Sequence, residues 1–133
     1  MIVEKEFNSD IESLNDIQDF ISQTAKNCDI PENIILRLNI CTDEIVSNII
    51  KFSEARTLSL KFVSGDDGRS FCSISYIDNG KPFNPVTEAK ELDTSVPLED
   101  REEGGMGVFI VKKMTKSVTY ERDGNLNIFT ISI

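Results

Sequence analysis

Apolar residues in the first half of the chain recur at two different periods, one typical of strands and one of helices. Residues 2–7 are partly alternating and predict an opening strand. A helical period follows up to about residue 28, and Asn8 or Ser9 is placed to cap that helix. Its apolar positions are Ile11, Leu14, Ile17 and Phe20 or Ile21.

A second and longer helix is predicted from about residue 31 to about residue 53. Pro31 suits its first position, where the missing backbone N–H would have no partner within the helix in any case. The apolar positions at helical spacing are Ile34, Leu38, Cys41, Ile45, Ile49 and Phe52, and Ile35, Ile40, Val46 and Ile50 widen the stripe. So wide an apolar face predicts a helix that is largely buried.

The second half of the chain predicts strands and one further helix. In order, the predicted elements are a strand at 58–62, a turn at 65–68, a strand at 71–77, a helix at 108–116 and a hairpin formed by 118–122 and 126–133. This order predicts an α+β two-layer sandwich, with helices on one face of a mixed, mostly antiparallel sheet. The sequence has no internal repeat or interdomain linker, so we expect residues 1–133 to form a single domain.

The charged residues of the chain exclude some classes of binding partner and of catalysis. The 133 residues include 23 acidic and 14 basic ones and no histidine, which gives a formal net charge of −9. So acidic a chain lacks the basic surface that nonspecific binding to nucleic acids or anionic membranes requires. The absence of histidine excludes Ser-His and Cys-His catalysis, histidine metal sites and phosphohistidine within this sequence.

The cysteines and the apolar runs indicate the cellular compartment that we expect for the protein. The cysteines Cys28, Cys41 and Cys72 are odd in number and form no Cys-x-x-Cys motif. We therefore expect a reducing, cytoplasmic environment, with the cysteines as core residues rather than nucleophiles. No run approaches the roughly 20 apolar residues of a transmembrane helix. The first residues do not resemble a signal peptide.

Glu44 and Asn48 lie four positions apart on the second predicted helix, so their side chains share one face. A carboxylate can act as a general base, and an amide oxygen can ligate a hard cation such as Mg²⁺. The alternative is an ordinary solvated face, because several other polar residues also lie on this helix.

The segment 78–85, with the sequence DNGKPFNP, follows a predicted strand. An aspartate such as Asp78 can accept a hydrogen bond from an exocyclic amine, and Gly80 allows a flat ring to approach the backbone. The alternative is a plain turn, because Asp-Asn-Gly is also strong turn chemistry.

A third candidate is the run Gly104-Gly105-Met106-Gly107, which opens the predicted helix at 108–116. Glycines leave backbone N–H groups free to face an anion, and a helix N-terminus adds partial positive charge. The alternative is a hinge or a poor helix start. The run is neither a P-loop nor a dinucleotide-binding fingerprint.

Together, these three segments resemble the motifs of the GHKL ATP-binding fold, also called the Bergerat fold. Within it, the chain is most similar to the stand-alone serine kinases that act as anti-sigma factors. Residues 42–48 (TDEIVSN) resemble the N box, and residues 78–85 resemble the first glycine box with its proline-rich tail. Residues 97–107 are similar to the end of the ATP lid and the second glycine box, and the hairpin at 120–125 also fits. The resemblance covers nearly the whole chain.

The resemblance implies a role for each matching residue. Asn48 would ligate a Mg²⁺ ion that bridges the ATP phosphates, and Glu44 would be the base toward the attacking hydroxyl. Asp78 would hold the adenine amine, with Gly80 packed beside the ring. The contacts with the phosphates would come from Gly104, Gly105 and Gly107, and from Arg101 when the lid closes.

One position departs from the family pattern. The family often has a histidine four residues after the N-box asparagine, whereas this chain has Phe52 there. Lys51, one residue earlier, is a candidate cofactor contact in its place. The absence of this histidine bears on the expected phosphoryl transfer more than on the expected ATP binding.

Residues 86–103 show no helical or strand periodicity, and they form a long connection for a compact domain. They hold seven acidic and two basic residues. The resemblance implies that they form the ATP lid. The alternative is a disordered acidic insertion.

The family implies an ATP- and Mg²⁺-dependent protein serine kinase that is also an anti-sigma-type regulator. It would phosphorylate a serine on a STAS-domain anti-sigma-factor antagonist, and in another state it would bind a sigma factor or another output protein. The family also implies a homodimer. A nucleotide-sensing binding module without kinase activity is the alternative, and an ATP-hydrolysing GHKL protein is a third hypothesis.

Overall fold

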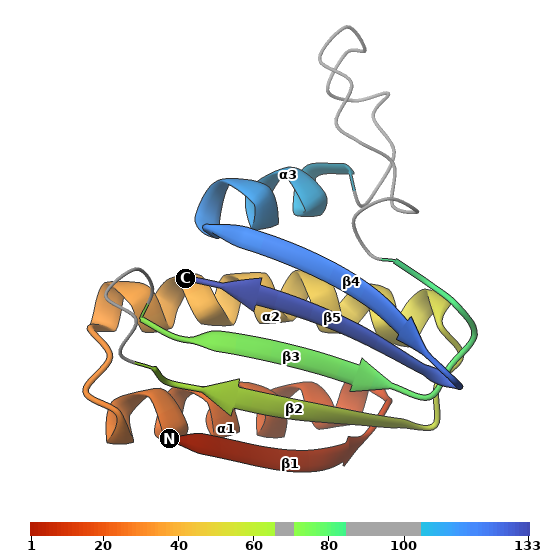
Figure 1. The fold of residues 1–133 in the computed structure, drawn as a ribbon, viewed down its shortest axis with the longest axis horizontal. Helices are drawn as coiled ribbons and strands as arrows, with labels where there is room; N and C mark the ends of the chain where they lie inside the picture. Colours follow the sequence, from red (N-terminus) through yellow and green to blue (C-terminus); the bar gives the residue numbers. More distant parts are fainter. Residues whose placement is uncertain (66–70, 85–104) are drawn as a thin grey trace, which may run out of the picture.

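The computed structural model describes residues 1–65, 71–84 and 105–133, and for 105–108 it describes the backbone alone. The elements in chain order are β1 (Ile2–Asn8), a 3₁₀ turn (Ile11–Ser13), α1 (Leu14–Asn27), α2 (Glu32–Phe52), β2 (Thr57–Val63), β3 (Ser73–Asp78), α3 (Gly105–Met114), β4 (Ser117–Asp123) and β5 (Leu126–Ser132). Figure 1 shows the strands side by side in one sheet. The predicted order of strands and helices is confirmed.

The five strands are arranged in the order β1-β2-β3-β5-β4, and every neighbouring pair among them is antiparallel. Within the described residues the sheet is therefore wholly antiparallel, whereas the sequence predicts a mixed, mostly antiparallel one. The last strand, β5, lies inside the sheet between β3 and β4. Its register places Asn127 directly opposite Asp78, at the C-terminal end of β3.

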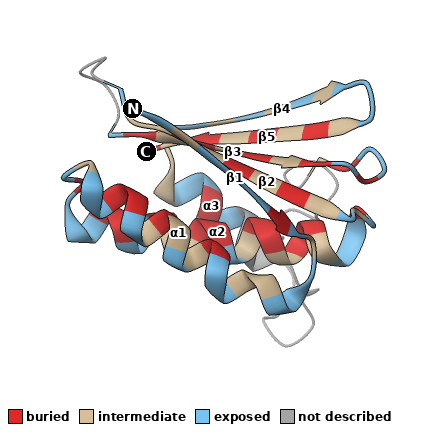
Figure 2. Cartoon of the chain, turned by 90° about the horizontal axis from the view of Figure 1, so that it is seen from below, coloured by how far each residue is buried: buried red, intermediate tan, exposed pale blue. Residues whose placement is uncertain are grey.

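The helices cover one face of the sheet, as Figure 2 shows from the side. Side chains alternate along β2, where Leu58, Leu60 and Phe62 are fully buried and the residues between them are partly exposed. The largest buried residues from the other elements are Ile17, Ile21, Leu38, Ile45, Ile49, Ile74, Tyr76, Phe129 and Ile131. The predicted α+β two-layer sandwich with helices on one face is thus confirmed.

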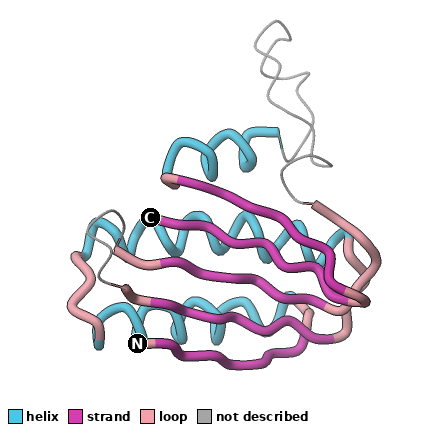
Figure 3. The backbone as a smooth tube through the Cα atoms, in the orientation of Figure 1, coloured by secondary structure: helices cyan, strands magenta, loops and turns pink. Residues whose placement is uncertain are grey.

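α2 is the longest helix, with 21 residues, and it runs across the back of the sheet (Figure 3). Its Thr42 hydroxyl lies 2.8 Å from the hydroxyl of Tyr76 on β3, and both residues are fully buried. Burial raises the pKa of Tyr76 well above its usual range, so this phenol stays protonated and can share a hydrogen bond with Thr42. None of the helices in the described part of the chain is long and apolar enough to cross a membrane.

The start of α1 differs from the prediction. Neither Asn8 nor Ser9 caps it, because β1 continues through Asn8. Asp10 caps the 3₁₀ turn before α1 instead, since its Oδ1 accepts a hydrogen bond of 3.0 Å from the backbone N–H of Ser13. The sequence offers three consecutive capping residues, and the length of the β1–β2 pairing selects the last of them.

The limits of the two other helices also shift. Pro31 precedes α2 as its N-cap residue rather than being its first residue. α3 begins at Gly105 and ends at Met114, so Gly105 and Gly107 belong to its first turn rather than to a loop before it.

The cysteines divide into two groups. Cys41 and Cys72 are buried, whereas Cys28 is partly exposed. Burial raises the pKa of Cys41 to about 11 and that of Cys72 to about 12. Both thiols therefore stay protonated at neutral pH, as expected of core residues.

Candidate functional site

Glu44 and Asn48 lie one helical turn apart on the C-terminal half of α2. Asn48 is only 7% exposed and lies between the buried residues Ile45 and Ile49, so it is not part of a solvated face. Glu44 is partly exposed. The helix therefore carries an amide at the edge of the core and a carboxylate beside it, which is what a cation site with an adjacent base requires.

The environment of Glu44 changes its acidity. Its own burial and, secondarily, the negative charge of Asp43 raise the pKa of the Glu44 carboxyl above its ordinary value. The positive charge of Lys51 acts in the opposite direction. A raised pKa makes the ionised carboxylate a better proton acceptor, which suits a general base. Lys51 itself is exposed and lies within electrostatic reach of Glu44.

Phe52 occupies the position where the resembled family often has histidine, and its ring contacts that of Phe83. The ring centroids are 5.5 Å apart, with planes inclined by 34°. Phe83 is 5% exposed, whereas Phe52 is 48% exposed. The pair packs the end of α2 against the loop that follows β3, and it offers apolar surface rather than a proton donor.

Asp78 is the last residue of β3 and is 2% exposed. Its Oδ1 accepts a hydrogen bond of 3.0 Å from the backbone N–H of Gly80 and another of 3.0 Å from Nδ2 of Asn127. Both bonds end on the same oxygen, so they fix the orientation of the carboxylate. A carboxylate held in this way can present Oδ2 as an oriented acceptor.

Asn127 on β5 organises the whole loop after β3, and the sequence analysis missed it. Besides Asp78, its Nδ2 bonds to the carbonyl of Lys81 at 2.8 Å. Its Oδ1 accepts hydrogen bonds from the backbone N–H of Phe83, the hydroxyl of Tyr120 and Nη1 of Arg122. The available signal was an asparagine in the series Asn127, Phe129 and Ile131, the buried positions of β5.

Gly80 lies against the end of α2. A Cβ at this position would be 2.1 Å from the carbonyl oxygen of Ser53, so no larger residue fits without a backbone shift. The next residue, Lys81, donates its backbone N–H to the same Ser53 oxygen at 2.8 Å. Gly80 is thus explained by the close approach of two backbones, and this contact joins the first glycine-box segment to the N-box helix.

The glycine run is the least described of the three segments. Gly105 and Gly107 lie in the first turn of α3, where backbone N–H groups have no partner within the helix. α3 packs against α2, and its first turn lies toward the same end of the molecule as the C-terminal ends of α2 and β3 (Figure 1). Arg101, Gly104 and the predicted lid at 86–103 lie outside the described residues.

The donor set fits a nucleotide with a cation. Asp78 provides an acceptor for an exocyclic amine, and Asn48 provides an oxygen ligand for a hard cation. Within residues 1–65, 71–84 and 105–133, no group of three or more Cys, Asp or Glu side chains could hold a metal ion by itself.

A model of a known protein family matches nearly the whole chain. The family model described as "Histidine kinase-like ATPase domain" matches residues 7–133. No curated protein matches the chain.

A solved structure shares the fold. The histidine kinase domain of the blue-light activated histidine kinase from Erythrobacter litoralis superposes with a TM-score of 0.50 and 13% sequence identity. The match covers 90% of this chain and 60% of that one, so it spans less than two thirds of the length of that chain. At this identity the likeness concerns the fold alone. The family match nevertheless extends over nearly the whole chain, so the chain belongs to the histidine kinase-like ATPase domain family, whose GHKL fold supports ATP binding.

Proposed function

We propose that the chain is an ATP- and Mg²⁺-dependent protein serine kinase of the anti-sigma-factor type. The observation that carries the nucleotide part is the Asp78 carboxylate, which is buried and oriented through Oδ1 by Gly80 and Asn127. In this proposal its Oδ2 accepts a hydrogen bond from the adenine amine. The buried, oriented acceptor supports selection of adenine over guanine, which has a carbonyl at the corresponding ring position.

The N-box helix would carry the chemistry. When bound, Mg²⁺ neutralises phosphate charge and orients the terminal phosphate. Asn48 holds the cation through its amide oxygen, and Glu44 accepts the proton of the attacking serine hydroxyl. The raised pKa of Glu44 supports this role because it brings the carboxyl closer to neutral pH. Lys51 contributes positive charge near the phosphates.

The remaining parts of the proposal follow from the family resemblance. Residues 1–133 act as one domain, with residues 86–103 as the lid over ATP. Arg101 and Gly104 contact the phosphates together with the backbone of Gly105 and Gly107. The substrate is a STAS-domain antagonist, the second partner is a sigma factor or another output protein, and the chain works as a homodimer in the cytoplasm. Phosphorylation adds negative charge to the antagonist, which this acidic protein would then repel.

A phosphate-transfer assay tests the kinase activity. The chain is incubated with Mg²⁺, ATP labelled at the γ-phosphate and a cognate STAS-domain protein, and acid-stable label on that protein is measured. We expect transfer by the wild type and a loss of about 100-fold or more in Glu44→Gln, as for the removal of a general base. Glu32→Gln is the matched control, because Glu32 is an exposed acid in the first turn of the same helix, far along it from Glu44.

The other outcomes separate the hypotheses. Label released only as free phosphate would indicate an ATPase. ATP binding without any transfer to a cognate STAS-domain protein would indicate a nucleotide-sensing module. Equal losses in Glu44→Gln and Glu32→Gln would contradict the assignment of Glu44 as the base.

Nucleotide binding has its own test. ATP with Mg²⁺ should raise the melting temperature of the wild type, because a ligand that binds only the folded state stabilises it. The part of the shift that depends on Mg²⁺ should be lost in Asn48→Ala and kept in Asn33→Ala, which alters an exposed asparagine of the same helix. No shift of the wild type at millimolar ATP would contradict the proposal.

A further inference from the structure

β1 lies at one edge of the sheet. The hydrogen bonds at its two ends show which of its residues direct their backbone N–H and C=O groups toward β2. The carbonyl of Met1 accepts a hydrogen bond from the N–H of Ser64, and the N–H of Ser9 bonds to the carbonyl of Arg56. Odd-numbered residues of β1 therefore direct their backbone groups toward β2. The backbone groups of Ile2, Glu4, Glu6 and Asn8 point the other way, where no described strand lies.

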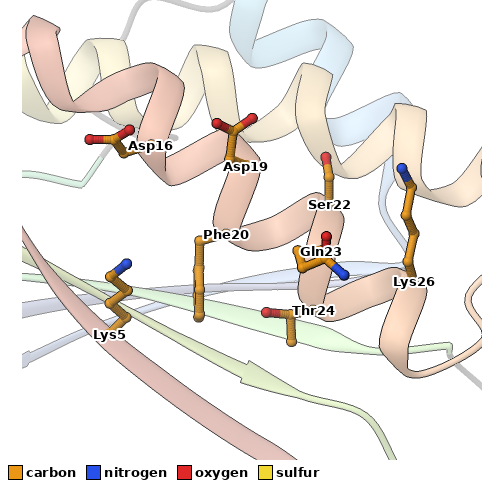
Figure 4. A pocket seen from close by; sticks show the side chains of 8 residues that line it. All are labelled: Lys5, Asp16, Asp19, Phe20, Ser22, Gln23, Thr24 and Lys26. Carbon is orange, nitrogen blue, oxygen red and sulfur yellow. The ribbon is translucent and has the colours of Figure 1, made fainter.

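A groove of about 620 Å³ runs between this strand and α1. Lys5 lines it from β1, and Asp16, Phe20, Gln23 and Thr24 are among the α1 residues that line it. Figure 4 shows Phe20 extending from α1 toward the strands, with Lys5 beside it. The 14 residues of α1 extend over about 21 Å and the 7 residues of β1 over about 23 Å, so helix and strand can flank one extended segment along their lengths.

We propose that the β1 edge and this groove bind an extended basic segment of a partner protein as a sixth strand. The outward backbone groups of the even-numbered residues would form the ladder. In an added strand, side chains alternate between the two faces of the sheet. Those on the helix side would enter the groove beside Phe20. Those on the open face, which the helices do not cover, would lie next to Glu4 and Glu6.

The negative charges on the open face of β1 favour a positively charged partner segment. Glu4 and Glu6 are both exposed and lie on the same face of β1. Across β2, Glu4 faces Lys61, whereas Glu6 faces Ser59. Glu6 is therefore the less compensated charge and the stronger attraction for a lysine or arginine of the added strand.

The same charges disfavour a second copy of this chain as the occupant. Two β1 strands that pair antiparallel around a two-fold axis at Glu4, Lys5 or Glu6 would place glutamate opposite glutamate on the open face. Directly opposed like charges destabilise a strand pair. A strand with lysine or arginine at alternate positions avoids this repulsion.

The test uses the full chain and a fluorescent peptide with alternating lysine and valine, and it reads binding by anisotropy. We expect saturable binding to the wild type, about tenfold weaker binding to Glu6→Lys, and little binding of a glutamate–valine peptide. Glu121→Lys is the matched control, because Glu121 is an exposed acid on the opposite edge strand β4 and its change alters net charge equally. We expect this control to bind nearly as the wild type does.

A second probe needs no mutation of the protein. The same peptide with alternate N-methylated residues keeps its charge but cannot donate a full ladder of hydrogen bonds, so its binding should be lost. The proposal is overturned if the N-methylated peptide binds equally, if Glu6→Lys and Glu121→Lys weaken binding equally, or if millimolar peptide does not bind. Self-association of the wild type that the lysine–valine peptide reverses would also overturn it, because a second copy would then cover β1. None of these readouts depends on ATP, so they leave the proposed kinase activity to its own test.

Discussion

The amide nitrogen of Asn127 donates a hydrogen bond of 3.0 Å to Oδ1 of Asp78, between two residues that stand directly opposite each other on β5 and β3. The carboxylate at the centre of the candidate site is thus oriented from a strand 49 residues later in the chain. Because Asn127 also bonds to Lys81 and Phe83, the C-terminal hairpin positions the loop that follows Asp78.

Removal of the Asn127 side chain should weaken both the fold and the site. Asn127→Ala leaves the buried Asp78 oxygen and the Lys81 carbonyl without their amide partner, which should lower the free energy of unfolding by about 2–4 kcal/mol. Urea denaturation measures this loss. Asn15→Ala, at an exposed position of α1, should change the same quantity by no more than about 0.5 kcal/mol. Similar values for the two variants would contradict the role of Asn127.

Gly80 should not tolerate even a methyl group. In Gly80→Ala the new Cβ would meet the Ser53 carbonyl at 2.1 Å, which forces the loop away from α2. We expect a loss of about 1–3 kcal/mol in the free energy of unfolding by overpacking, together with weaker ATP binding. Gly65→Ala is the control, because a Cβ there meets no atom within 4 Å. Wild-type stability of Gly80→Ala would show that the loop can shift freely.

The buried hydroxyl pair of Thr42 and Tyr76 should show strong coupling. Tyr76→Phe removes one partner and leaves a polar group in the core, so the free energy of unfolding should fall by about 1–3 kcal/mol. The double variant Thr42→Val with Tyr76→Phe should lose less than the sum of the single losses, because no unpaired hydroxyl remains. Strictly additive losses in chemical denaturation would argue against a direct bond between the two hydroxyls.

Glu44 should make the stability of the protein depend on pH with a definite sign. Its pKa is raised in the folded state, so its stabilising contribution is present below its unfolded pKa and is lost as pH rises through the folded pKa. Glu44→Gln, which stays neutral, should therefore melt at a higher temperature than the wild type at neutral pH. This difference should shrink toward zero in acid.

The control for this prediction is Glu121→Gln, which removes the same negative charge from an exposed position on β4. Thermal melts from acid to neutral pH compare both variants with the wild type. An equal gain in the two variants at neutral pH would assign the effect to net charge rather than to the environment of Glu44.

Local patterns predicted much of the fold because they depend on contacts within a few residues. The helical period of α2 and the alternation in β2 came directly from the apolar spacing. Boundaries were less well predicted where two local signals competed. Asp10 rather than Asn8 caps the first turn because strand pairing with β2 extends through Asn8. The glycines that open the helix predicted at 108–116 belong to its first turn, because α3 begins at Gly105.

The sequence by itself determined the alternating strands, the buried helix with Glu44 and Asn48 one turn apart, and the aspartate that ends β3. The tertiary structure alone decided how these parts meet. It placed Asn127 opposite Asp78, and it brought Gly80 against the backbone of Ser53. The physical reason is that periodicity reports which face of an element is buried, whereas strand register and backbone contacts depend on residues far apart in the chain.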